Sequence, residues 1–146
     1  MSAVLKKSAA TAVLAVTMTT GSVLAAAPAQ ALPAPVTSCG PSVKAGATGL
    51  HLQTCVTRDG ISVTGRTRVT NAGPAAHYVA EMQTKINWGA GGYSVCPVNS
   101  WIQPGISGSC TDPVVSVTNQ PSHYIGWARY WDGVAYVWVN ANSPSI

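Results

Sequence analysis

Apolar and polar residues alternate with a period of two in several short segments of this chain, and turn-forming residues separate those segments. Such alternation is typical of β-strands that bury one face. The clearest case spans residues 50–70, where Asp59-Gly60 divides two alternating runs. Because Asp-Gly suits the positive φ angles of a type I′ turn, we predict a hairpin in which position i pairs with position 119 − i. Val56 then faces Val63 on the apolar side of the hairpin.

A second hairpin is predicted over residues 124–140, around Asp132-Gly133, with position i opposite position 265 − i. Arg129 faces Tyr136 in this register, while the opposite side carries smaller residues such as Ala128. The large side holds four aromatic residues and one arginine: Trp127, Arg129, Trp131, Tyr136 and Trp138. The two sides of this hairpin therefore differ sharply in side-chain size.

Further strands are predicted at three places and a flexible glycine-rich loop at a fourth: residues 75–86, 93–98 and 114–118, and the loop 89–92. In the first of these strands Tyr78 and Met82 lie on the same side, although its Ala, Glu, Met and Gln residues would also suit a short helix. The chain shows no repeat and no linker. The pattern predicts one all-β domain over residues 32–146, a small antiparallel two-sheet sandwich, or a barrel-like variant of it, stapled by two disulfides.

The first 31 residues have the layout of a secretory signal peptide. Lys6 and Lys7 precede an apolar stretch over residues 9–27, and the small-residue sequence Ala29-Gln30-Ala31 follows. Threonines interrupt the apolar stretch, so we expect no membrane span. We predict cleavage before Leu32 and a soluble protein that is secreted to the extracellular space. Residues 32–38, which contain two prolines, are expected to be flexible.

The charge of the chain gives little sign of a nucleic-acid partner. The full sequence carries a formal net charge of +4, and removal of the leader takes away two lysines, so six basic and four acidic side chains leave +2. Nucleic-acid binding usually needs a clustered basic face. Only Arg66 and Arg68 are close neighbours in the predicted mature chain, and this pair is typical of a solvated strand, so no nucleic-acid partner is predicted.

Four cysteines remain after the predicted cleavage: Cys39, Cys55, Cys96 and Cys110. In a small secreted domain an even number of cysteines indicates structural disulfides. Three pairings are open on sequence alone. We favour Cys39–Cys55 with Cys96–Cys110, because each bond closes a short loop and is worth about 3 kcal/mol in the chain-entropy model. Cys-x-x-Cys is absent and the three histidines are scattered, so neither a metal nor a cofactor is predicted.

The large side of the 124–140 hairpin is the candidate binding surface, but it has two interpretations. Its rings either pack in the core or form an exposed platform, and large aromatic residues are buried on average. Arg129 favours exposure, because a buried arginine needs a carboxylate and the chain has four acidic residues in all. An exposed platform of flat rings suits an extracellular protein or a glycan. The predicted ligand-binding residues are Trp127, Arg129, Trp131, Tyr136 and Trp138.

No catalytic signature in the chain is strong. The segment 105–109, Gly-Ile-Ser-Gly-Ser, resembles a nucleophile elbow but ends in serine and follows no long strand. A paired-carboxylate glycosidase would have to combine Glu81 with a turn aspartate. A Ser-His-Asp site built on His77 or His123 stays open. We therefore favour a non-catalytic binding domain, with a small hydrolase, an enzyme inhibitor and a structural cell-surface protein as alternatives, and leave the oligomeric state open.

Overall fold

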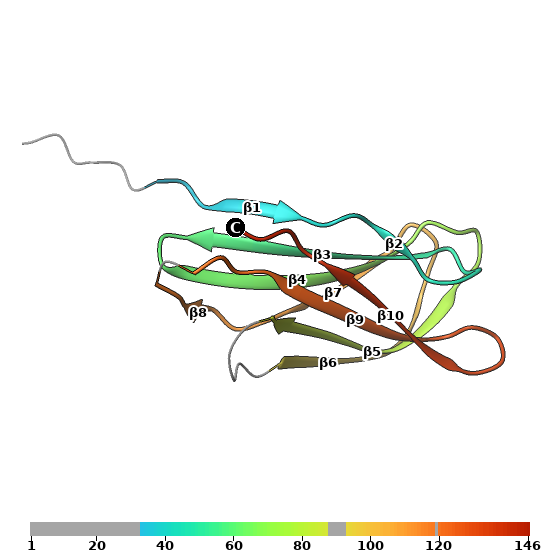
Figure 1. Cartoon of the computed structure of the whole chain (residues 1–146). Helices are drawn as coiled ribbons and strands as arrows, with labels where there is room; N and C mark the ends of the chain where they lie inside the picture. The colour runs from blue at the N-terminus through green and yellow to red at the C-terminus, as the bar shows by residue number, and fades with distance from the viewer. Residues whose placement is uncertain (1–32, 88–92, 119) are drawn as a thin grey trace, which may run out of the picture. The chain divides into compact units, whose positions relative to one another are not determined.

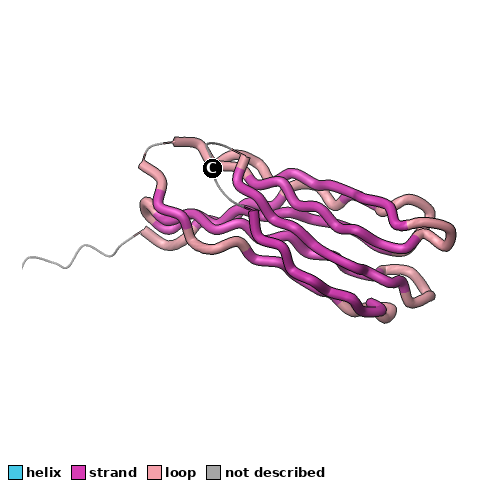
Figure 2. Tube along the Cα trace, turned by 90° about the horizontal axis from the view of Figure 1, so that it is seen from below, coloured by secondary structure: helices cyan, strands magenta, loops and turns pink. Residues whose placement is uncertain are grey.

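A computed structural model describes residues 33–87, 93–118 and 120–146 of the chain (Figure 1). The predicted signal peptide, residues 1–31, and the predicted loop 89–92 lie outside this part. The ten strands of the described ranges are β1 (Val36–Cys39), β2 (Val43–Lys44), β3 (Leu50–Asp59), β4 (Ser62–Asn71), β5 (His77–Ile86), β6 (Tyr93–Ile102), β7 (Ser107–Thr111), β8 (Val115–Ser116), β9 (Tyr124–Trp131) and β10 (Tyr136–Asn142). Short loops join most of them (Figure 2).

The strands form two antiparallel sheets that pack face to face. Sheet A has the order β1-β3-β4-β7, with β2 also paired to β3 and β8 to β4, and sheet B has the order β10-β9-β5-β6. Figure 1 shows β3 and β4 in one layer and β5 and β6 in the other. The all-β, two-sheet prediction is confirmed, and the sandwich is not a closed barrel. Within the residues described, no helix has the length and apolar character needed to cross a membrane.

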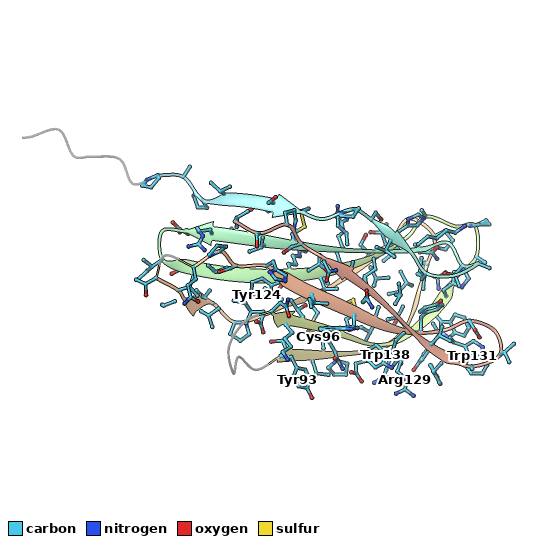
Figure 3. The ribbon with its side chains drawn as sticks, viewed as in Figure 1. Tyr93, Cys96, Tyr124, Arg129, Trp131 and Trp138 are labelled. Carbon is cyan, nitrogen blue, oxygen red and sulfur yellow. A yellow bond between two sulfur atoms is a disulfide. The ribbon has the colours of Figure 1, made fainter. Side chains whose placement is uncertain are left out.

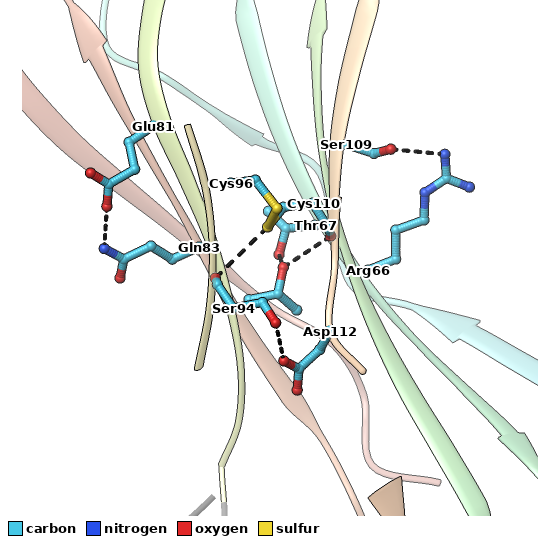
Figure 4. The surroundings of a disulfide bond; sticks show 10 residues. Arg66, Thr67, Glu81, Gln83, Ser94, Cys96, Ser109, Cys110 and Asp112 are labelled. Carbon is cyan, nitrogen blue, oxygen red and sulfur yellow. Dashed lines mark hydrogen bonds between the residues drawn. A yellow bond between two sulfur atoms is a disulfide. The ribbon is translucent and has the colours of Figure 1, made fainter. Parts of the chain in front are cut away.

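Two disulfides staple the sandwich, and both have the favoured pairing. Cys39–Cys55 joins the neighbouring strands β1 and β3. Cys96–Cys110 joins β6 of sheet B to β7 of sheet A (Figure 4). The first bond therefore fixes one edge of a sheet, whereas the second holds the two sheets together.

The interior consists of two apolar clusters with a hydroxyl-bearing layer between them. One cluster includes Leu50, Leu52, Val69, Met82 and Tyr130, and the other includes Val56, Val63, Ile86 and Tyr124. Between them the Thr84 hydroxyl is hydrogen-bonded to the Thr67 hydroxyl (2.7 Å) and to the Cys110 carbonyl oxygen (3.0 Å). Gly126 of β9 lies against this layer, where a Cβ atom would overlap the hydroxyl oxygens of Thr67 and Thr54. Gly126 therefore lets the two sheets approach closely.

The register of the first hairpin differs from the prediction by two positions. Asp59 pairs with Ser62, and Val56 pairs with Gly65 instead of Val63. The loop is Gly60-Ile61, and the positive φ of 58° at Gly60 falls on the first loop position, as in a type II′ turn. A shift of two positions leaves every side chain on its predicted face. The apolar side of the hairpin is therefore buried, as predicted.

The second hairpin is also shifted by two positions. Trp131 pairs with Tyr136 across a four-residue loop, so Arg129 lies opposite Trp138 and the predicted Arg129–Tyr136 pair is wrong. The Asp132 carboxylate accepts hydrogen bonds from the backbone N–H groups of residues 134 and 135, both at 2.8 Å. This local capping stabilises a longer loop than Asp-Gly alone predicts. The two faces of the hairpin again keep their predicted composition.

A β-bulge in β5 reverses the expected orientations of Tyr78 and Val79. The register of β5 shifts between Val79 and Glu81 against both of its neighbours. Val79 and Met82 are both buried, although strict alternation would place them on opposite sides. Tyr78 consequently points outward, so its predicted location beside Met82 is wrong. β5 is a strand throughout, which rejects the helical alternative for this segment.

Candidate binding face

The outward surface of sheet B carries most of the chain's aromatic residues. We call it the aromatic face, and its members are Tyr78, Tyr93, Trp101, Trp127, Trp131, Tyr136 and Trp138, together with Arg129. Figure 3 shows Tyr93, Arg129, Trp131 and Trp138 along one side of the molecule. Strand pairing builds this surface, because cross-strand partners in a sheet point to the same side.

The five predicted ligand-binding residues all belong to this face. Trp131, Tyr136 and Trp138 are 36, 45 and 48 % exposed, whereas Trp127 and Arg129 are partly buried. The opposite side of the hairpin faces the interior, where Ala128 and Tyr130 are almost fully buried. The structure therefore excludes core packing as the role of the exposed rings. Their role in binding a ligand stays a prediction.

Four rings, one from each strand of sheet B, surround an open pocket of about 350 Å³: Tyr78 of β5, Trp101 of β6, Trp131 of β9 and Tyr136 of β10. Tyr78 lies 5.7 Å from Trp101 and 6.2 Å from Tyr136 between ring centroids, and Trp131 lies 5.2 Å from Tyr136. The rings meet edge to face, with interplanar angles of 62–69°. This geometry is favourable for aromatic pairs and leaves ring surface open to the pocket.

The prediction missed Tyr78 and Trp101, which form half of this pocket. They pair with each other in register across β5 and β6, far from the C-terminal hairpin in sequence. Finding them needs the strand order of sheet B, which local alternation does not give. Val79 and Met82 are three positions apart and both buried, which the bulge in β5 makes possible, and the same bulge turns Tyr78 outward. The burial of both residues is not evident from the sequence.

Arg129 lies beside the pocket and stacks on its wall. Its guanidinium carbon is 4.9 Å from the centroid of the Tyr136 ring, within cation–π range. In register, Arg129 lies between Trp138 of β10 and Glu81 of β5. The Glu81 carboxylate accepts a hydrogen bond from the Gln83 side-chain amide (Figure 4). Polar groups with planar geometry therefore border the aromatic pocket.

The loop that follows Trp131 is held by Asp132. Hydrogen bonds from the backbone N–H groups of Ala135 and Val134 favour the ionised carboxylate and lower the pKa of Asp132. The same bonds set the geometry of the loop between Trp131 and Tyr136, two walls of the pocket. Asp132 is thus a positioning residue for the aromatic face.

The outward surface of sheet A is different in composition. We call it the hydroxyl face, and its members include Thr37, Gln53, Thr57, Thr64, Arg66, Arg68, Thr70, Ser107, Ser109 and Thr111. Arg66 and Arg68 donate hydrogen bonds to the hydroxyls of Ser109 (3.1 Å) and Ser107 (3.0 Å) on the neighbouring strand. These two arginines are therefore parts of a solvated sheet surface, as the sequence indicated.

In the described residues neither histidine has the hydrogen bonds of a Ser-His-Asp site, although His77 lines a pocket of about 260 Å³ together with Asp132. The His123 ring is hydrogen-bonded to the Asn87 side chain, and His77 Nε2 accepts a long, 3.5 Å hydrogen bond from the Gly49 N–H. Within residues 33–87, 93–118 and 120–146, no three His, Cys, Asp or Glu side chains form a group that could hold a metal ion. The aromatic face is consequently the most developed candidate site.

Comparison with known proteins gives no further guide: no protein-family model matches the chain, and no curated protein is significantly similar to it.

Proposed function

We propose that the mature chain is a secreted, non-catalytic domain that binds a carbohydrate chain on the aromatic face. The observation that carries this proposal is the four-ring pocket, to which every strand of sheet B contributes one exposed or half-exposed ring. Large apolar patches on a monomer's surface usually mark binding sites, because they cost free energy in water. The predicted leader supports secretion, and the two disulfides are consistent with an extracellular location.

The chemistry of the face suits a sugar. Indole and phenol rings offer flat apolar contact area with few rotatable bonds, so little conformational entropy is lost when a ring stacks on the apolar side of a pyranose. Beside the rings lie side chains that can hydrogen-bond hydroxyl groups, namely Glu81, Gln83 and Asn140 on neighbouring strands. A sugar needs both kinds of contact, apolar stacking and directed hydrogen bonds.

The size of the face suits a short oligosaccharide. Four strands spaced about 4.8 Å apart, with β9 of 8 residues as the length, give a planar area of roughly 500 Å². An oligosaccharide of a few residues fits a planar area of this size.

Strand addition at the β6 edge of sheet B is also disfavoured. The edge strand β6 contains Pro97, which lacks a backbone N–H, and Asn99, whose φ of 42° marks the irregular stretch of the strand. Both features interrupt the row of backbone donors and acceptors that an added strand would need. The face of the sheet is therefore a better recognition surface than the β6 edge.

The test is a binding screen of the secreted protein against soluble neutral and acidic polysaccharides, followed by calorimetry with oligomers of those that bind. Replacing either ring in Trp101→Ala or Trp131→Ala should weaken binding about tenfold or more, in line with the loss of a central aromatic anchor. Ile61→Ala and Val114→Ala are matched controls, because these apolar side chains are 60 and 63 % exposed but lie outside sheet B. They should leave the affinity unchanged.

Two results would overturn the proposal. One is the absence of binding to every polysaccharide tested. The other is binding that both tryptophan variants retain in full while they stay folded, as judged by circular dichroism. A protein ligand captured through the same rings would reject the carbohydrate but keep the aromatic face as the binding site.

A further inference from the structure

The four arginines that follow the predicted leader differ in how their guanidinium groups are used. Arg58 donates to the carbonyl oxygen of Gln120 at 2.7 Å, and Arg66 and Arg68 donate to serine hydroxyls. The guanidinium group of Arg129 makes no hydrogen bond to another residue in the described part of the chain and contacts the Tyr136 ring instead. Its N–H donors are consequently available to a ligand, at the border of the aromatic pocket.

The carboxylate nearest in register does not use these donors. Glu81 lies opposite Arg129 on β5, but its carboxylate accepts the amide of Gln83 on its own strand (Figure 4). Lys85 is the further charged side chain on the outward side of β5. The outward strand positions of sheet B carry Arg129 and Lys85 against Glu81 in the described ranges, and Asp132 lies in the loop after Trp131. Arg129 contacts a wall of the pocket, so a ligand carboxylate would meet its guanidinium donors directly.

We infer that the carbohydrate ligand is acidic, and that Arg129 selects it by pairing with the carboxylate of a uronic acid residue. This inference rests on the proposed carbohydrate-binding function and names the class of sugar. The planar guanidinium fork matches a carboxylate with two parallel N–H···O bonds, which a lysine cannot reproduce.

The position of Arg129 prepares it for this role. Stacking on Tyr136 restricts the long side chain, so less conformational entropy is lost when the guanidinium binds. The same ring is a wall of the four-ring pocket. A pyranose stacked there would place a substituent on its rim within reach of the guanidinium. The positive charge beside the rings also disfavours a cationic ligand.

The experiment compares polymers that differ in charge alone. Polygalacturonate, alginate and hyaluronan are titrated calorimetrically into the full secreted protein, each beside its methyl-esterified form. Wild-type protein should bind at least one acidic form about 10- to 100-fold more tightly than its ester, the range expected for a charge-assisted hydrogen-bonded pair. A sulfated polymer of similar charge should bind less tightly than the preferred uronate.

Three variants locate the source of the preference. Arg129→Gln and Arg129→Lys should both bring the ratio of acid to ester affinity toward one, because neither residue offers the fork. Glu81→Gln should raise affinity for the acidic form, since it removes the negative charge opposite Arg129. Arg68→Gln is the matched control, an arginine on the hydroxyl face, and it should leave the ratio unchanged.

The failures of the two proposals are distinguishable. If the acidic and esterified forms bind equally, or if Arg68→Gln lowers the ratio as much as Arg129→Gln does, selection by Arg129 is wrong while carbohydrate binding stands. Equal binding of the sulfated polymer would likewise reject a carboxylate-specific site. If no polymer binds, or if Trp101→Ala binds as wild type does, the carbohydrate-binding function itself is wrong.

Discussion

The two outward faces of this sandwich follow the same alternation but are different surfaces. On the hydroxyl face, short polar side chains and arginines satisfy one another across strands, as in the pairs Arg66–Ser109 and Thr37–Thr57. On the aromatic face, rings contact rings, and Arg129 contacts a ring. The first arrangement is what solvation alone requires. The second exposes apolar area that solvation does not explain, and this difference directs the search for function to sheet B.

The difference also shows what alternation can and cannot indicate. A period of two identifies which side of a strand faces the core, and it does so equally for both sheets. It does not indicate whether the other side is an ordinary surface or a site. That distinction comes from side-chain type, because tryptophan, tyrosine and arginine are the residues most enriched in binding hot spots.

The two sheets share one closely packed interior, and Gly126 is the position where this packing tolerates an added methyl group least. Gly126→Ala should lower the free energy of unfolding by about 3 kcal/mol, because the added methyl overlaps the Thr67 and Thr54 hydroxyls. Gly108→Ala is the control, since its Cβ would lie 3.5 Å from Met82 Cε, an ordinary contact. Urea denaturation measures both. Equal stability of the two variants would show that the sheets are not packed this closely.

The two disulfides also differ in position. Cys96–Cys110 lies between the two sheets, whereas Cys39–Cys55 lies at the edge of the hydroxyl face. Replacing either pair with alanines should cost about 3 kcal/mol, given sequence separations of 14 and 16. We expect the larger loss for Cys96–Cys110, because Cys110 is fully buried and its removal also leaves a cavity. Urea denaturation of the two double variants gives the order. A larger loss for Cys39–Cys55 would contradict this account of how the sheets are held.

Tyrosines on the inward side of sheet B should ionise at a higher pH than free tyrosine. Burial, with a contribution from Asp112, raises the pKa of Tyr124 to about 12, and burial followed by Asp132 raises the pKa of Tyr130. Because folding favours the neutral phenol, the stabilisation from Tyr124 is complete below pH 10 and is lost as the pH rises toward about 12. Tyrosinate absorbance, with Tyr124→Phe for assignment, measures this. Ionisation of Tyr124 near pH 10 in the folded protein would contradict its burial.

The smallest effect is expected on the free energy of unfolding when a single side chain on either outward face is replaced by alanine. Trp131→Ala should cost about 1 kcal/mol, from the lost ring contact with Tyr136, and Arg68→Ala about 0.5 kcal/mol. Thermal unfolding measures both. If Trp131→Ala unfolds the domain, the ring is a structural element, and the contrast between the two faces loses its functional meaning.

The sequence predicted the side of the strand on which a residue lies better than it predicted the residue opposite it on the neighbouring strand. Both Asp-Gly hairpins form, but each register is shifted by two, because Gly60 takes the first loop position and the Asp132 carboxylate caps a longer loop. A shift of two preserves the side on which each residue lies. The composition of the two sides of each hairpin was therefore predicted correctly, even though individual pairs such as Arg129–Tyr136 were not.

The disulfide pairing was predictable because short loops are favoured when cysteines lie close in sequence. The pocket was only half predictable. Trp131 and Tyr136 are neighbours across one hairpin loop. Tyr78 and Trp101 lie beside them only because of the strand order in sheet B and the bulge in β5. Strand order depends on long-range packing, which a local pattern does not encode.

The central claim, that ligands bind on the aromatic face, is tested most directly by nuclear magnetic resonance of isotope-labelled protein titrated with the tightest-binding uronate oligomer. We predict that the indole N–H signals of Trp101 and Trp131 and the Nε–H signal of Arg129 shift with the ligand, while the amides of β3, β4 and β7 stay in place. Shifts centred on the hydroxyl face, or binding that leaves these three side chains unchanged, would contradict the claim.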